Sequence, residues 1–210
     1  MVTKEELMAM INAKIELYNP RGGLSQTAKF FLALIGINHG DTREHCERVA
    51  LLAEQVARMT KMDAKAAFFA GLLHDTGKLV LPASLFDGHN ISAEEYAHVK
   101  EHAIAGFRAL RGLHAFTALC AGLHHNLYKA GYGLTLEDFP KDWSMATIKK
   151  VLEISAVISV CDFIDAYTHR ATKILDGSAG SDLRTMLVQK YPDDVLVVDL
   201  ALLANDEMGL

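Results

Sequence analysis

Cysteine and proline are scarce in this chain, and it carries no excess of basic charge. Its three cysteines are odd in number and have no metal-binding spacing, which predicts reduced thiols and not a disulfide framework. Its four prolines, beside a hydrophobic share of 50%, indicate a globular, helix-rich protein. The formal net charge of −5 argues against a broad surface for a nucleic-acid polymer, and leaves open a local basic pocket for a small phosphorylated ligand.

No stretch of the sequence has the pattern of a membrane span or a secretion signal. The segment "MVTKEELMAM" carries acidic residues early and lacks the apolar run of a signal peptide. The most apolar stretches, residues 30–37 and 195–204, are too short to cross a bilayer, and the second contains Asp199. We therefore expect a cytoplasmic protein with no membrane partner.

Apolar residues recur at intervals of three and four along much of the chain, a spacing that predicts helices. Capping-box patterns mark two helix starts, at Thr3 with Glu6 and at Ser92 with Glu95, and Asp63 can cap another helix. The predicted helices span residues 3–17, 24–37, 41–59, 64–75, 93–110, 116–126, 145–175 and a segment from 183. The segments 76–91 and 127–143 predict irregular structure, and 193–205 suits either a helix or a strand. Because no long linker divides the chain, we expect one all-α domain.

Histidine is abundant, with ten residues, and several histidines interrupt apolar helix faces together with aspartates. These interrupting residues are Asp41, His45, His74, Asp75, His102, His124, His125 and Asp162. Each has a plain explanation when it is taken singly. Asp41 suits a helix N-cap as well as a metal ligand, and a lone histidine on an apolar face is more often a satisfied core residue.

Taken together, these residues predict a metal centre, because a divalent cation can satisfy many buried imidazoles and carboxylates at once. Mixed nitrogen and oxygen donors favour iron or manganese, with zinc, nickel or magnesium as alternatives. The lack of a thiolate among them argues against a closed structural zinc site. The remaining histidines are expected to have ordinary structural roles: His39, His89, His98, His114 and His169.

Several motifs in this set resemble a known family. His45, the pair His74-Asp75 and Asp162 match, in type and order, the "H…HD…D" signature of the HD superfamily of metal-dependent phosphohydrolases. The segments "HDTGK", "HAIAGFRAL", "HHN" with "GYG", and "CDFIDAYTHR" resemble motifs of its HD-GYP subfamily. The resemblance covers residues 41–170.

The chain departs from the subfamily pattern near the expected substrate pocket. The GYP motif reads Gly131-Tyr132-Gly133 here, so its proline is missing, and Asn126 replaces the acid that follows the paired histidines. These departures leave the expected metal ligands complete and affect the expected substrate.

The resemblance implies an HD-domain-like helical bundle with two divalent metal ions in its core. The implied ligands of the first ion are His45, His74, Asp75 and Asp162. Those of the second are His102, His124 and His125, with Asp75 bridging the two ions. In some members an acid one turn before the first histidine helps to bind a third metal, and Asp41 occupies that position.

The same resemblance implies hydrolysis of a phosphodiester by a hydroxide that the metals share. Lys78 would pair with a phosphate or the leaving oxygen, the alternative being an ordinary surface lysine. Arg170 is a second candidate for that role. Tyr132 would stack on a base or, equally, pack on its neighbours, and Asp165 would face solvent or brace Arg170.

Three functions follow as hypotheses. The first is a phosphodiesterase for a cyclic dinucleotide such as cyclic di-GMP. The second keeps the metals but acts on another nucleotide or phosphate ester, and the third is a non-catalytic signalling scaffold. We expect an HD-GYP-like catalytic core over residues 41–175, N-terminal helices over 1–40 that pack on it or mediate a homodimer, and an extension of the same domain over 176–210.

Overall fold

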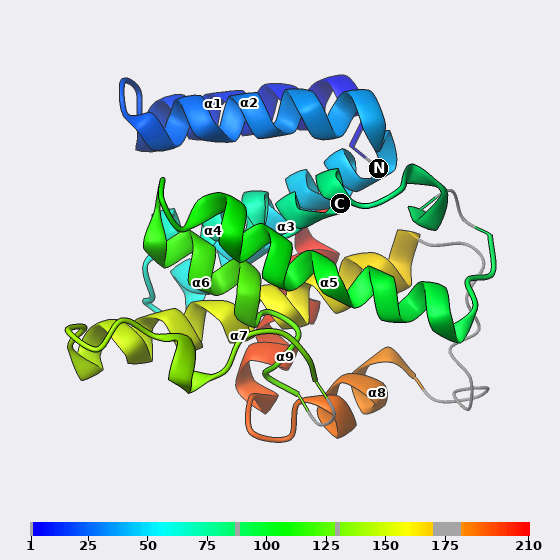
Figure 1. Cartoon of the computed structure of the whole chain (residues 1–210). Helices are drawn as coiled ribbons and strands as arrows, with labels where there is room; N and C mark the ends of the chain where they lie inside the picture. Colours follow the sequence, from blue (N-terminus) through cyan, green and yellow to red (C-terminus); the bar gives the residue numbers. More distant parts are fainter. Residues whose placement is uncertain (1, 87–88, 129–130, 170–181) are drawn as a thin grey trace.

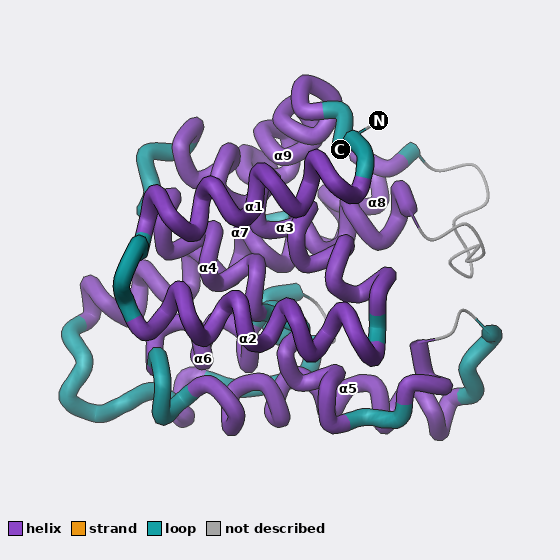
Figure 2. The backbone as a smooth tube through the Cα atoms, turned by 90° about the horizontal axis from the view of Figure 1, so that it is seen from above, coloured by secondary structure: helices purple, strands orange, loops and turns teal. Residues whose placement is uncertain are grey.

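Every regular element that the structure describes is a helix (Figures 1 and 2). The computed structural model describes residues 2–86, 89–128, 131–169 and 182–210. The α-helices are α1 (Lys4–Tyr18), α2 (Gly23–Asn38), α3 (Gly40–Met59), α4 (Ala64–Leu73), α5 (Ala93–Leu110), α6 (Ala115–Leu123), α7 (Met145–His169), α8 (Leu183–Lys190) and α9 (Val195–Met208). Short 3-10 helices are η1 (Thr76–Val80), η2 (Ala83–Phe86) and η3 (Leu136–Asp138). The all-α prediction is confirmed.

The predicted caps mark real helix starts. Complete capping boxes are present at Thr3 before α1 and at Ser92 before α5, and the Asp63 side chain accepts a hydrogen bond from the Ala66 amide before α4. A cap of this kind satisfies an amide that has no partner within the helix and contributes about 1 kcal/mol.

The structure corrects some of the sequence predictions and decides one that was open. The segments 76–91 and 127–143, expected to be irregular, contain the short helices η1, η2 and η3. The ambiguous C-terminal segment is the helix α9, whose buried residues Val197, Val198, Ala201 and Ala204 lie on one helical face. Helix α3 begins at Gly40, so Asp41 lies in its first turn and is not an N-cap. The predicted continuation of α7 beyond residue 169 lies outside the described residues.

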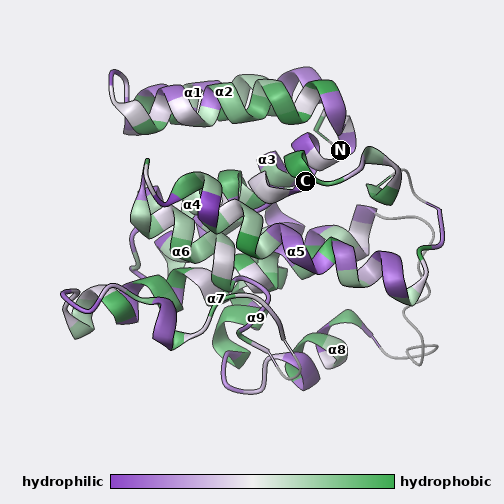
Figure 3. Ribbon diagram, in the orientation of Figure 1, coloured by the Kyte–Doolittle hydropathy of each residue, from purple (hydrophilic) through white to green (hydrophobic). Residues whose placement is uncertain are grey.

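Two apolar clusters form the interior. The larger one joins α3, α4, α6, α7 and α9, and the hydropathy colouring of Figure 3 shows apolar residues along α4, α6 and α9. The second lies where α1 and α2 cover α3 and α4, at the top of Figure 1. Among the described helices, none is both long and apolar enough to span a membrane.

A buried carboxylate fastens α1 to α3. Glu54 is only 2% exposed, and its Oε1 atom accepts hydrogen bonds from Lys14 Nζ at 2.7 Å, Tyr18 Oη at 2.5 Å and Arg58 Nη2 at 2.7 Å. A buried charge is costly unless it is paired and hydrogen-bonded, so these three donors keep Glu54 ionised between the helices.

Glycine allows η1 to touch α5 directly. A Cβ atom on Gly77 would lie 1.9 Å from the carbonyl oxygen of His102 and 2.6 Å from the amide nitrogen of Gly106. Both obstacles are backbone atoms, which cannot rotate away. This close approach holds the chain that follows Asp75 against the helix that carries His102.

We expect Gly77→Ala to lower the free energy of unfolding by at least about 1–3 kcal/mol, because the added methyl group must push η1 away from α5. Urea unfolding of the metal-free protein measures the effect. Gly112→Ala is the matched control, since a Cβ atom at Gly112 meets no atom within 4 Å. Equal stability of the two variants would contradict the direct contact between η1 and α5.

Candidate metal centre

Seven of the eight predicted ligands, all except Asp41, come together from five helices. His74 and Asp75 directly follow α4, and His124 and His125 directly follow α6, so the ends of two apolar helices deliver four of them. The other three project from within longer helices: His45 from α3, His102 from α5 and Asp162 from α7. Helices α4 and α6 are buried along most of their length, and this packing fixes the polar residues at their ends.

The predicted ligands form two groups of potential ligand atoms, each with all its atoms within 4.8 Å of one another, and a third group of this kind joins His74 and Asp75 to the thiol of Cys46. Burial raises the pKa of the Cys46 thiol well above its usual value, which disfavours the thiolate that would bind a metal. The first group is His45, His74 and Asp162, and the second is His102, His124 and His125. Asp75 faces both. Its Oδ2 atom lies 3.6 Å from His45 Nε2 and 3.5 Å from His74 Nε2, and its Oδ1 atom lies 3.3 Å from His102 Nε2.

Backbone carbonyls orient three of the imidazoles. In each case Nδ1 donates a hydrogen bond to the carbonyl oxygen three residues earlier: His74 to Gly71 at 2.7 Å, His102 to Val99 at 2.5 Å, and His124 to Ala121 at 2.7 Å. Because a carbonyl oxygen only accepts, the proton sits on Nδ1. Each Nε2 atom of a neutral ring then carries a free lone pair directed into the cluster.

A carboxylate orients the fourth imidazole, a role that the sequence motifs did not indicate. Asp165 Oδ2 accepts a hydrogen bond from His45 Nδ1 at 2.7 Å, while Arg48 Nε donates to Asp165 Oδ1 at 2.6 Å. Asp165 is 4% exposed, so the expectation that it faces solvent is wrong, and Arg170 lies outside the described residues. The available signal was spacing: Arg48 follows His45 by three residues, as Asp165 follows Asp162.

Two tyrosines contact the fifth imidazole. His125 Nδ1 lies 3.3 Å from the Tyr128 hydroxyl, and its ring stacks on that of Tyr132 with centroids 4.6 Å apart and planes at 29°. Tyr132 therefore packs on a neighbour through one face while it also lines the pocket described below.

The residues present fit divalent metal ions. The Nε2 atoms of His45 and His74 are buried and make no well-directed hydrogen bond in the described part of the chain, although His45 Nε2 lies 3.1 Å from Asp162 Oδ1. Such orphaned atoms are costly unless another group satisfies them. Burial lowers the pKa of His102 to about 4 and that of His125 to about 3, although nearby carboxylates oppose the shift. These rings are neutral at neutral pH and can offer lone pairs to a cation.

The two carboxylates of the cluster stay ionised in spite of their burial. Burial alone would raise the pKa of Asp75, but Lys78 and the surrounding imidazoles hold it well below its usual value. Burial also opposes ionisation of Asp162, whose pKa is kept low chiefly by His45 and His125. Burial lowers the pKa of the His45 imidazole, but the carboxylates of Asp162 and Asp165 outweigh burial and raise this pKa. A metal ion would therefore compete with a proton at His45.

Lys78 is part of this centre and not a surface lysine. It is 6% exposed, its ammonium group pairs with Asp75 Oδ2, and it lies 5.3 Å from the centre of the Phe86 ring. Asp41, by contrast, is exposed in the first turn of α3 and joins neither ligand group.

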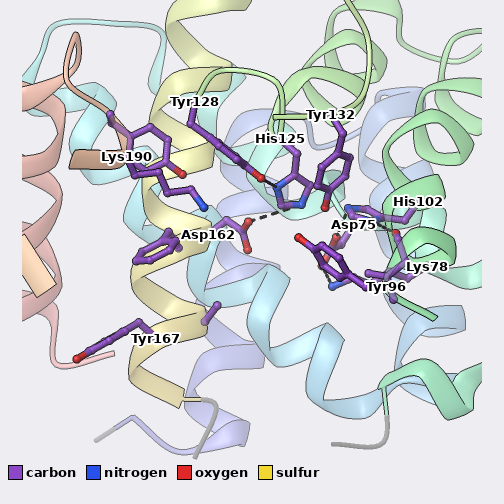
Figure 4. A pocket seen from close by; sticks show the side chains of 14 residues that line it. Asp75, Lys78, Tyr96, His102, His125, Tyr128, Tyr132, Asp162, Tyr167 and Lys190 are labelled. Carbon is purple, nitrogen blue, oxygen red and sulfur yellow. Dashed lines mark hydrogen bonds and ion pairs between the residues drawn. The ribbon is translucent and has the colours of Figure 1, made fainter. Parts of the chain in front are cut away.

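A pocket of about 240 Å³ opens onto the cluster (Figure 4). Asp75, His102, His125 and Asp162 lie at its base. Its remaining walls are mainly aromatic and basic: Lys78, Tyr96, Val99, Tyr128, Tyr132, Phe163, Ala166, Tyr167, Lys190 and Tyr191. A substrate in this pocket would therefore meet the predicted ligands, two ammonium groups and several rings.

The Gly131-Tyr132-Gly133 segment adopts a conformation that excludes the subfamily's proline. Gly133 has φ +115°, whereas proline is restricted to about −65°. A Cβ atom on Gly133 would also lie 2.2 Å from the Gly122 carbonyl oxygen. Asn126 Nδ2 donates a hydrogen bond to the Leu134 carbonyl oxygen at 2.5 Å and so ties the segment to the end of α6. The two departures from the motif thus belong to one local structure.

The chain belongs to the HD domain family, whose model matches residues 42–168. Its structure is similar to two crystal structures of the HD domain of the L. monocytogenes phosphodiesterase PgpH, one of them in complex with cyclic-di-AMP. Each likeness has a TM-score of 0.50 at 18% sequence identity and covers 85% of both chains, which supports the shared fold. No curated protein matches the chain significantly. The family model covers the HD domain as a whole and does not distinguish the HD-GYP subfamily.

We expect Asp165→Asn to weaken metal retention about 10- to 100-fold, because the amide orients His45 less well and lowers its basicity. Competition with a chromogenic chelator measures the affinity. The matched control is Asp199→Asn. Asp199 accepts two hydrogen bonds from Arg184 on the exposed surface, just as Asp165 accepts two from Arg48 in the interior. Equal metal affinities for the two variants would show that Asp165 does not position a ligand.

Proposed function

We propose that this protein is a metal-dependent phosphodiesterase that hydrolyses a cyclic dinucleotide. The observation that carries the proposal is the convergence of imidazole Nε2 atoms and two ionised carboxylates at the base of a pocket that also contains Lys78. A structural metal site would not need a pocket lined by cations and aromatic rings. The likeness to a phosphodiesterase HD domain supports the same reaction class.

Two divalent ions fit the two ligand groups. His45, His74, Asp75 and Asp162 would hold the first ion, and His102, His124 and His125 the second, with Asp75 facing both. Iron or manganese suits this donor set. The exposure of Asp41 favours two ions over three. When bound, such ions supply Lewis-acid activation of water and neutralise charge on the phosphoryl group.

The protein's own residues then bind and orient the substrate. Lys78 donates from its buried ammonium group to a phosphoryl or leaving oxygen, and its ion pair with Asp75 keeps it directed at the centre. The rigid attachment of Asp75 to the end of α4 and of Lys78 to η1 fixes that geometry before substrate arrives. Arg170, which lies outside the described residues, stays a candidate for a second phosphate contact.

The pocket walls suit a substrate with flat bases. Tyr96, Tyr128, Tyr132, Phe163 and Tyr167 offer ring faces or edges, on which nucleobases stack with little sequence preference. The PgpH HD domain forms a complex with cyclic-di-AMP, and the HD-GYP resemblance points to cyclic di-GMP. We therefore propose cyclic dinucleotides as the substrate class and both compounds as the first to test.

A second candidate is hydrolysis of another nucleotide or phosphate ester. The conformation at Gly133 favours it, because the loop beside the pocket differs in structure from any loop that carries the subfamily's proline there. The third hypothesis, a non-catalytic scaffold, is disfavoured because the ligand set is complete and buried.

We expect the metal-loaded protein to hydrolyse cyclic di-AMP or cyclic di-GMP, and Lys78→Met to lower kcat by about 10²–10³ with metal content unchanged. Methionine keeps the apolar stem packed beside Phe86 but removes the charge. Chromatographic product analysis and metal analysis of the same samples measure both quantities. Hydrolysis of simple phosphate esters alone would favour the second candidate, and full metal content without any hydrolysis would contradict the phosphohydrolase.

A further inference from the structure

A second lysine, Lys190, lines the pocket in addition to Lys78 at the centre. Lys190 is the last residue of α8, and its ammonium nitrogen lies over the ring of Tyr128, 3.9 Å from the centroid. The same nitrogen lies 4.6 Å from the centroid of Phe163 and 6.0 Å from that of Tyr191. Three aromatic rings thus surround the end of this side chain and hold it at the pocket wall.

Lys190 has no carboxylate within ion-pair distance among the residues that the structure describes. Burial lowers the pKa of the Lys190 ammonium group, and the more distant negative charge of Asp162 opposes this shift without cancelling it. Aromatic faces attract an ammonium group by about 0.5–2 kcal/mol, which compensates part of the cost of burying it. Its donors still face the pocket without an acceptor, and an anion is the ligand that would satisfy them.

The two pocket lysines lie on opposite sides of the centre. Figure 4 shows Lys78 beside Asp75 at one end of the pocket and Lys190 beyond Asp162 at the other. Lys78 forms an ion pair with Asp75, whereas Lys190 forms no ion pair with a carboxylate among the residues that the structure describes. An anion bound to Lys190 would therefore occupy a position distinct from a phosphate held at the centre beside Lys78.

We propose that Lys190 binds a second phosphate group of the substrate, so that α8 makes the site prefer phosphodiesters that carry two phosphates. This inference rests on the proposed function. It gives a part in substrate selection to helix α8, which lies outside the HD motifs. A cyclic dinucleotide, with two phosphates joined by two nucleosides, has the required chemistry.

A purely structural role for Lys190 makes a different prediction. A lysine in the last turn of a helix interacts favourably with the helix C-terminus, and its stem packs on Tyr128. If that were its whole contribution, a substitution would change stability, and activity would fall equally on every substrate. The ratio of activities on two kinds of substrate therefore separates the two roles.

The test compares Lys190→Met, Lys190→Arg and the control Lys150→Met in metal-loaded protein. Lys150 also lies over a ring, that of Phe116 at 5.5 Å, but outside the pocket. The substrates are cyclic di-AMP and cyclic di-GMP, with two phosphates, and bis(p-nitrophenyl) phosphate, with one. We expect Lys190→Met to lower the ratio of kcat/KM on the dinucleotide to that on the single-phosphate ester about 10- to 100-fold, mainly through KM. Lys190→Arg should keep most of the wild-type ratio, and Lys150→Met should leave the ratio unchanged.

An unchanged ratio of kcat/KM values in Lys190→Met overturns the inference, whether activity stays at the wild-type level or falls equally on both kinds of substrate. A wild-type protein that hydrolyses neither kind refutes the proposed function instead. In that case calorimetric binding of cyclic di-AMP and of 5′-AMP to the metal-loaded protein decides the role of Lys190. A selective loss of dinucleotide affinity in Lys190→Met supports it, and equal affinities in wild type and variant, or no binding at all, overturn it.

Discussion

The structure depends on the hydrogen bonds that four of the five cluster imidazoles make through Nδ1 to a carbonyl or a carboxylate oxygen. Three of these bonds end on carbonyls of the preceding helical turn and one on Asp165, so the protons are held away from the centre. The Nε2 atoms are left buried, neutral for the most part, and convergent. A protein core tolerates such a cluster only when another group satisfies it, and the carboxylates of Asp75 and Asp162 supply the negative charge that attracts a cation.

The rest of the fold holds these rings in place. Helices α4 and α6 are short, apolar and buried, and each ends directly at a pair of cluster residues. The contact of Gly77 with the His102 carbonyl brings η1 against α5, so that Asp75 and Lys78 lie beside the second group of histidines. Glu54, outside the centre, fixes the N-terminal cover to α3, the helix that carries His45. Precision at the centre is thus a consequence of ordinary helix packing.

Much of the fold could be predicted from the sequence because its signals are local. Caps at Thr3, Asp63 and Ser92 and the apolar periodicity of the helices depend on neighbouring residues. The order of the histidine and aspartate motifs along the chain predicted that these side chains lie close together in the fold. Asp165 and Lys190 were missed because their partners are distant in sequence: His45 lies 120 residues from Asp165, and the Tyr128 ring belongs to another segment. The sequence alone indicated only that Gly133 stands where the subfamily has a proline. The φ angle of +115° was needed to show that a proline does not fit there.

The most direct test of the central claim is the metal content of protein purified without chelator and reconstituted anaerobically with iron or manganese. We expect two divalent ions per chain by mass spectrometric element analysis, and about one in a His102→Ala/His124→Ala variant that keeps the first ligand group. Retention of both ions in that variant would contradict the assignment of the second group. A chain that binds no metal tightly after reconstitution would contradict the account as a whole.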